Sequence, residues 1–146
     1  MRLYNIYGKL VYKNVRSKKI NWSAKSRSKL QKSVKDFLSD YWSNHIVYEE
    51  FPVYGTRMAV DILNATKKIA IEVNGNQHDN YVKFFHGSRS GYLKSIKRDV
   101  EKANWLEQNG FTLIELIVVM AGLAALSSFT IPSFLNSIKL NRIEEA

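Results

Sequence analysis

The segment from Ala59 to His78, AVDILNATKKIAIEVNGNQH, places two acids inside apolar runs of sequence. The aliphatic and β-branched residues around Asp61 and around Glu72, separated by the polar stretch 64–68, predict two strands joined by a turn. A carboxylate buried in such a strand is costly unless a partner compensates its charge. A divalent cation with oxygen ligands, such as Mg²⁺, would be that partner. The alternative is that both acids face solvent from half-buried strands.

Polar and turn-forming residues follow the second strand directly, in the sequence EVNGNQH at positions 72–78. An α/β sheet commonly places its site just beyond the strand ends. The position of these residues therefore favours a site over two solvent-facing acids.

Four separated pieces of the chain, including PVYGTRMAVDIL, KKIAIEVNGNQH and KSIKRDVEKANWLEQNGF, occur in the order found in PD-(D/E)XK nucleases. The chain resembles the branch of very-short-patch-repair-like, phage and homing endonucleases over about residues 26–116. This resemblance implies a restriction-endonuclease-like α/β core, with a mixed, mostly antiparallel sheet flanked by helices. It also implies hydrolysis of phosphodiester bonds in double-stranded DNA with Mg²⁺ or Mn²⁺ as cofactor.

The resemblance also implies catalytic roles for individual residues. Asp61 and Glu72 would hold the metal ion, Gln77 and His78 would form a polar pair beyond the strand, and Asp99 would support the histidine. For Asp99, an exposed ion pair with nearby Lys102 is the alternative.

The chain departs from the family pattern at two positions. Asn74 stands where many members carry the lysine of the last motif letter, so His78 is expected to assist the attacking water instead. Gln31 occupies the place of a helix glutamate. We interpret it as the partner of Ser28 in a helix capping box.

Positive charge is concentrated in the nuclease-like part. The net charge is +9, and residues 1–35 hold eleven lysines and arginines without an acid. Such a surface favours phosphate backbones as partners, while a merely solvated surface is the alternative. Eight residues are the candidate DNA contacts: Lys18, Lys19, Lys25, Arg27, Lys29, Lys32, Lys35 and Asn74. The chain has no cysteine, which excludes disulfides and is compatible with a cytoplasmic location.

Periodicity predicts the remaining elements. A hairpin is expected within 2–15, strands at 46–51 and 111–116, and a polar loop at 79–91. A helix at 27–42 would bury a stripe that includes Leu30 and Trp42, and would leave Lys29, Lys32 and Lys35 free for phosphates. A second helix at 92–108 would bury five residues: Leu93, Ile96, Val100, Ala103 and Leu106.

The C-terminal part has a different character. Residues 116–138 are 23 positions without a charge, which is long enough for a membrane-spanning helix. The sequence GFTLIEL, starting at Gly110, resembles the prepilin cleavage and methylation segment of type IV pilins. That resemblance implies cleavage after Gly110, methylation of Phe111 and a filament-assembly role for Glu115.

The two resemblances compete for residues 111–116, which cannot be a sheet strand and a pilin helix at once. We expect the strand when the nuclease core is folded. Three regions follow: a basic arm or hairpin at 1–25, an endonuclease-like core at 26–116 and a pilin-like helix at 117–146. The alternative function is a prepilin-like membrane or filament protein, or an inactive fusion with a DNA-binding nuclease relic. The nuclease part is expected in the cytoplasm, and the apolar segment 116–138 makes the inner membrane and a second copy of the chain candidate partners.

Overall fold

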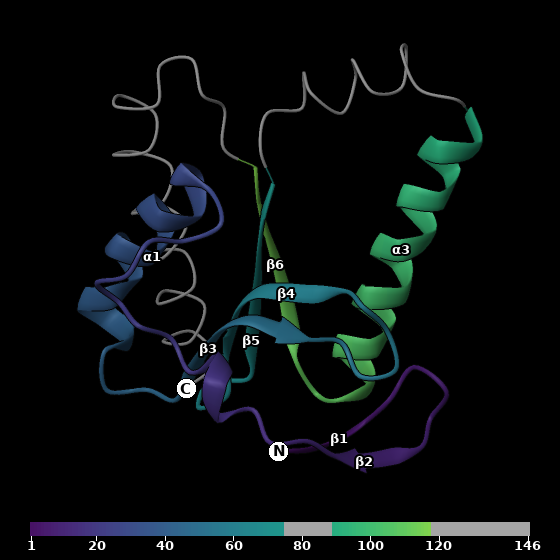
Figure 1. Ribbon diagram of the computed structural model, residues 1–146, viewed down its shortest axis with the longest axis horizontal. Helices are drawn as coiled ribbons and strands as arrows, with labels where there is room; N and C mark the ends of the chain where they lie inside the picture. The colour runs from purple at the N-terminus through teal and green to yellow at the C-terminus, as the bar shows by residue number, and fades with distance from the viewer. Residues whose placement is uncertain (75–88, 118–146) are drawn as a thin grey trace, which may run out of the picture.

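The computed structural model describes residues 1–74 and 89–117 of the chain (Figure 1). Predictions for Gln77, His78, residues 79–88 and the apolar segment from 118 onward lie outside the described residues. The described elements, in chain order, are β1 (Arg2–Tyr4), β2 (Leu10–Tyr12), the 3-10 helix η1 (Arg16–Lys18), α1 (Lys29–Trp42), β3 (Val47–Pro52), β4 (Ala59–Asn64), β5 (Ile69–Asn74), α3 (Arg89–Gln108) and β6 (Thr112–Ile117).

Four strands form one sheet in the order β3-β4-β5-β6. β3, β4 and β5 pair antiparallel, whereas β6 runs parallel to β5 after the chain has crossed over through α3. The prediction of a mixed α/β fold with a mostly antiparallel sheet is confirmed. β3 extends to Pro52, one residue beyond the predicted strand, which is tolerated because β3 is an edge strand.

Helices α1 and α3 lie on opposite sides of this sheet in Figure 1. Each face carries its own apolar cluster. The α1 side includes Val34, Leu38, Trp42, Val47, Ile62 and Ile71. The α3 side includes Phe51, Tyr54, Val60, Leu63, Trp105, Leu106 and Phe111. A residue's place along a strand therefore decides which helix its side chain meets.

The expected buried stripe of α3 is wrong over its first half. Leu93, Ile96 and Val100 are exposed, and Trp105, absent from that stripe, is almost fully buried. The reason is visible in Figure 1, where only the last turns of α3 approach the sheet. A helical period locates an apolar face but not the length of sheet available to cover it.

The N-terminal segment packs on the α3-side cluster. β1 and β2 pair antiparallel as the predicted hairpin, and Leu3 and Val15 are buried in that cluster. Further along, Lys19 forms an isolated antiparallel bridge with Tyr48 at the free edge of β3. This bridge covers part of an edge that would otherwise be open to pairing.

The segment shared by the two resemblances is a strand. β6 pairs with β5 over six positions, and Phe111 is buried with its amide donating to the Leu106 carbonyl at 2.9 Å. Gly110 adopts a φ of +81° in the turn between α3 and β6, a conformation that favours glycine. The expected sheet strand at 111–116 is therefore confirmed. Within residues 1–74 and 89–117, no helix has the length and apolar character needed to cross a membrane.

Candidate active site

Asp61 and Glu72 come together across the β4–β5 pair. The register pairs Ile62 with Ile71, so the two acids occupy the next position along the strands. The Asp61 carboxylate accepts a hydrogen bond of 2.8 Å from the Val73 amide, which ties it to the end of β5. Asp61 and Glu72 are both half-buried. Two carboxylates thus share a place with little access to water.

Glu72 also meets a lysine from α3. Lys102 Nζ lies 3.0 Å from Glu72 Oε1, and both side chains are largely buried. Apart from this ion pair, the buried oxygen has no hydrogen-bond partner among the described residues. Burial first, and the charge of Asp61 second, raise the pKa of Glu72 to about 8, although Lys102 lowers it. The lysine therefore compensates the acid pair only in part.

The backbone is unusual directly across from Asp61. Glu49 pairs with Ile62 and Phe51 with Val60, which leaves Glu50 opposite Asp61 and outside the paired register. Glu50 has a φ of 53°, the left-handed region that non-glycine residues rarely adopt. Such strain is often found at functional sites. Here it turns the strand so that Glu49 contacts α1 while Phe51 packs on the α3 side.

A cleft of about 700 Å³ opens between the β3–β4 loop and α3. Asp61 and Glu72 do not line it, but Lys102, the ion-pair partner of Glu72, does. Three arginines, Arg27, Arg57 and Arg98, line it, together with the acids Glu50, Asp99 and Glu101. A smaller cavity of about 20 Å³ is lined by Glu72, Asn74, Asp99, Lys102, Leu113 and Glu115. Because Asp99 and Lys102 line both spaces, they connect the acid pair with the wider cleft.

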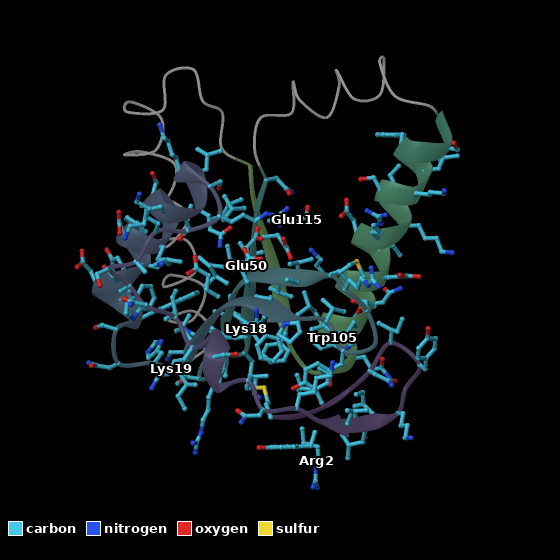
Figure 2. All side chains as sticks on the ribbon, in the orientation of Figure 1. Arg2, Lys18, Lys19, Glu50, Trp105 and Glu115 are labelled. Atoms are coloured by element: carbon cyan, nitrogen blue, oxygen red, sulfur yellow. The ribbon has the colours of Figure 1, made fainter. Side chains whose placement is uncertain are left out.

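Glu115 of β6, labelled in Figure 2, lies in register with Glu72 of β5. Since paired residues of parallel neighbours point to the same face of the sheet, Glu115 adds a further, exposed carboxylate at this end. No group of three or more histidine or acidic side chains converges as a metal-ligand set in the part of the chain that the structure describes. Two carboxylates, one of them with a buried oxygen that lacks a hydrogen bond, nevertheless fit one Mg²⁺ ion that keeps several waters.

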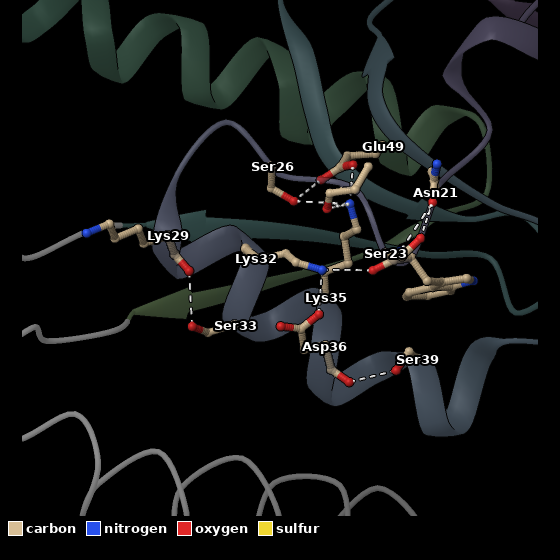
Figure 3. Close-up of polar contacts among 12 residues, drawn as sticks. Asn21, Ser23, Ser26, Lys29, Lys32, Ser33, Lys35, Asp36, Ser39 and Glu49 are labelled. Atoms are coloured by element: carbon tan, nitrogen blue, oxygen red, sulfur yellow. Dashed lines mark hydrogen bonds and ion pairs between the residues drawn. The ribbon is translucent and has the colours of Figure 1, made fainter.

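Lys35 is not free for DNA, contrary to its prediction. Its side chain is 0% exposed, and Nζ donates to the Ala24 carbonyl at 2.9 Å, to Ser26 at 3.3 Å and to Glu49 at 3.0 Å (Figure 3). Lys35 lies off the apolar stripe of α1, but this side of the helix faces β3 and not solvent. Lys32 is also engaged, by Asp36 and the Trp22 carbonyl.

Gln31 forms only half of the expected capping box. Its amide donates to Ser28 Oγ at 3.1 Å, as an N-cap requires. Its side chain, however, is buried and donates to Glu49 at 3.0 Å and to Glu50 at 3.1 Å. Gln31 therefore holds the strained Glu50 next to the cleft, a role that helix periodicity did not indicate.

The other candidate DNA contacts are distributed over the surface. Lys18, Lys19, Lys25, Arg27 and Lys29 are exposed, and Figure 2 places Lys18 and Lys19 near the lower end of the sheet. Of this set only Arg27 lines the cleft, and Asn74 lines the smaller cavity. Sequence reasoning missed Arg57, Arg98 and Lys102. The spacing R98-D99-xx-K102 was a usable signal, because it puts the three residues within one turn of a helix.

The prepilin-like residues lie in β6 and in the turn that precedes it. Gly110 is exposed in its turn, Phe111 is buried, and Glu115 lies beside Glu72. Lys68 Nζ also lies over the Phe111 ring, 5.1 Å from its centre. Release of a fragment that begins at Phe111 would therefore require Phe111 to leave the core and β6 to leave the sheet.

Comparison with known proteins gives two matches. The family described as the prokaryotic N-terminal methylation motif matches residues 106–127. The uncharacterized protein 033L of invertebrate iridescent virus 3 is 32% identical over 65 residues, which are 44% of this chain and 34% of that protein. The chain thus spans about a third of the length of this relative. No solved structure matches the chain.

Proposed function

We propose that this chain is a metal-dependent endonuclease that hydrolyses phosphodiester bonds in double-stranded DNA. The observation that carries the proposal is the incompletely compensated pair Asp61 and Glu72 beside a cleft lined by arginines. Burial of two adjacent carboxylates is unfavourable on its own. A divalent cation would displace the proton that Glu72 keeps near neutral pH and would stabilise both carboxylates, and a phosphate would complement the arginines.

Asp61 and Glu72 would hold the cation. When bound, Mg²⁺ or Mn²⁺ supplies a water of lowered pKa and stabilises negative charge on phosphate oxygens. The chain's contribution is to fix the two carboxylates: the Val73 amide holds Asp61, and the β4–β5 register sets its place beside Glu72. His78 and Gln77 remain proposed partners in proton transfer, and Asp99 remains the proposed support of the histidine.

Lys102 would supply the positive charge that a lysine at position 74 supplies in many members of the PD-(D/E)XK family and that Asn74 cannot supply. It lines both the small cavity beside Glu72 and the wider cleft, so one ammonium group can contact the carboxylate and a phosphate in the cleft. Asn74 lies two residues beyond Glu72 on the same side of β5 and lines the same small cavity. A positive charge at this point would stabilise charge that develops on the phosphate.

Cleavage of supercoiled plasmid by the full chain tests the proposal. Nicked or linear product is expected with Mg²⁺ or Mn²⁺ and none with a chelator. Asp61→Asn should reduce the rate by about a thousandfold or more while DNA affinity stays the same or rises, because one repelling charge is removed. Metal-dependent cutting that survives in Asp61→Asn would refute the proposed site.

A second candidate function is a prepilin-like membrane or filament protein, which the match to the N-terminal methylation motif favours. In that function the bond after Gly110 is cut, Phe111 is methylated, and the inner membrane is the location. The β5–β6 pairing argues against processing of the folded chain, since β6 would have to leave the sheet. Co-expression with a prepilin peptidase, followed by mass measurement, tests it: a fragment that begins at Phe111 would favour this function over the nuclease.

A further inference from the structure

The hairpin β1–β2 has one face turned to the core and one turned to solvent. Leu3 and Val11 pair with each other and pack on the α3-side cluster. The register also pairs Arg2 with Tyr12 and Tyr4 with Leu10, and these four side chains are exposed. The outward face is therefore made of Arg2, Tyr4, Leu10 and Tyr12, called here the tyrosine face.

Aromatic rings are accessible on this face and beside it. Tyr4 is 43% and Tyr12 67% exposed, and Tyr7, in the turn between the two strands, is 81% exposed. Large apolar side chains grouped on a surface commonly mark a binding site. Tyr4 and Tyr12 are diagonal neighbours across the two strands, a spacing at which two ring surfaces can serve consecutive groups of one ligand.

The charge around the tyrosine face indicates what that ligand is. Residues 1–35 contain no acid, and Arg2 projects away from the body of the molecule in Figure 2. Lys9 is exposed beside the turn. A partner must therefore combine negative charge with flat apolar surfaces. Unpaired nucleotides have both, whereas a duplex keeps its base faces stacked inside.

The tyrosine face is held rigidly from behind. The Tyr4 carbonyl accepts hydrogen bonds from Trp105 Nε1 at 2.6 Å and from Asn109 Nδ2 at 3.1 Å, while its amide donates to Asn109 Oδ1 at 2.8 Å. At the turn, the Ile6 amide donates to the Tyr54 carbonyl at 3.0 Å. A ligand would thus meet rings on a fixed backbone, which lowers the entropic cost of binding.

The turn of the hairpin contacts the β3–β4 loop, which borders the cleft. Asn5 and Ile6 lie close enough to Gly55 that a side chain there would touch them. The next three residues, Thr56, Arg57 and Met58, line the cleft beside α3. A nucleic-acid strand that leaves the cleft along this loop would reach the turn of the hairpin.

We propose that the tyrosine face of β1–β2 binds unpaired bases of a nucleic-acid strand by stacking, with Arg2 and Lys9 contacting the phosphates. This goes beyond the proposed DNA cleavage and does not depend on it, because it concerns binding alone. Its consequence is a preference for substrates with a single-stranded region, such as an overhang, a loop or a branch.

Binding of the full chain in chelator tests the proposal without cleavage. The two probes are a labelled oligothymidylate and an abasic oligomer of equal length and charge. The wild-type chain is expected to bind oligothymidylate about tenfold or more tightly, the effect of one or two stacked bases. The double variant Tyr4→Ser, Tyr12→Ser should bind both probes equally and keep the wild-type affinity for the abasic oligomer.

Two controls separate stacking from loss of structure. Tyr4→Phe with Tyr12→Phe keeps the rings and should keep the preference, and Tyr41→Ser on α1 should leave it unchanged. Equal binding of both probes by the wild-type chain would overturn the proposal, as would a preference that persists in the serine variant. Binding to lipid vesicles that is lost in the serine variant, without binding to oligothymidylate, would also contradict the proposal. These outcomes are independent of whether the chain cuts plasmid.

Discussion

Two buried lysine–glutamate pairs occupy the two sides of the same sheet, and they differ in how completely they are satisfied. On the α1 side, Lys35 Nζ has three oxygen partners, and Glu49 also accepts from Ser26 and Gln31. On the α3 side, Lys102 faces a Glu72 oxygen without a hydrogen bond, and Asp61 adds a second negative charge.

The difference separates a structural pair from a candidate site. A buried pair with all its partners in place fixes the elements that carry it. An incompletely compensated pair beside a cleft can take up a cation or substrate, because binding supplies the missing interactions. Lysine and glutamate have the same chemistry in both places, so the surroundings decide between scaffold and site.

The largest expected effect concerns stability. Lys35→Met should lower the free energy of unfolding by roughly 3 to 5 kcal/mol, because it leaves Glu49 buried without its cation. Lys102→Met should cost less than about 1 kcal/mol at pH 7, since Glu72, with its pKa near 8, is already mostly protonated. Urea unfolding of both variants makes the comparison. Equal losses of unfolding free energy in the two variants would show that Lys102 compensates Glu72 as fully as Lys35 compensates Glu49.

The second expectation concerns cleavage by Lys102 variants. Lys102→Ala should slow plasmid cleavage by about a hundredfold with little change in DNA affinity, because the ammonium acts on charge that develops during the reaction. Asn74→Lys in the same chain should restore part of the rate, since residue 74 lines the same small cavity. A double variant as slow as Lys102→Ala, although folded, would show that a charge at this place is insufficient.

The third expectation concerns pH. The pKa of Glu72 rises from 4.5 to about 8 on folding, so the folded chain binds more protons than the unfolded chain between these values. Stability without cation should therefore fall as pH rises through this window, by roughly 1 kcal/mol for each pH unit in its middle. Unfolding experiments at several pH values check this slope. Glu72→Gln should flatten it, and an unchanged slope would place the titrating group elsewhere.

The smallest expected effect concerns phosphate contacts. Arg27→Gln, Arg57→Gln and Arg98→Gln should each weaken binding to all DNA sequences alike and reduce the salt dependence of log K by roughly 0.9. Lys68→Gln is the matched control, because its ammonium lies over the Phe111 ring away from the cleft. A larger effect at Lys68 than at the arginines would move the DNA path to the other end of the sheet.

The helices and strands were easier to predict from the sequence than the contacts that their side chains make with other elements. The α1 helix, the hairpin and the strands around Asp61, Glu72 and Phe111 were expected from local pattern and are present. Local pattern cannot show which neighbour an off-stripe residue meets, so Lys35 was assigned to solvent although β3 covers it. For the same reason Trp105 and the exposed half of α3 were missed.

The acid pair was predictable because β4 and β5 are consecutive strands, which usually pair. Lys102 was not, because its contact with Glu72 depends on where α3 crosses the sheet. The strained Glu50 was also unpredictable, since a left-handed φ at a glutamate has no local sequence signal. Residues brought together by long-range packing are thus the part of the site that sequence reasoning omits.

Plasmid cleavage by two matched variants, Glu72→Gln and Glu49→Gln, tests the difference between the pairs most directly. Both replace the carboxyl group of a buried lysine–glutamate pair with an amide, which cannot ionise to bind a cation, and both keep the shape of the side chain. With Mg²⁺ or Mn²⁺, at a temperature where both are folded, Glu49→Gln is expected to cut at close to the wild-type rate and Glu72→Gln to be inactive. Cutting by Glu72→Gln, or no cutting by the wild-type chain with either cation, would contradict the assignment of the Asp61–Glu72 pair as a catalytic metal site.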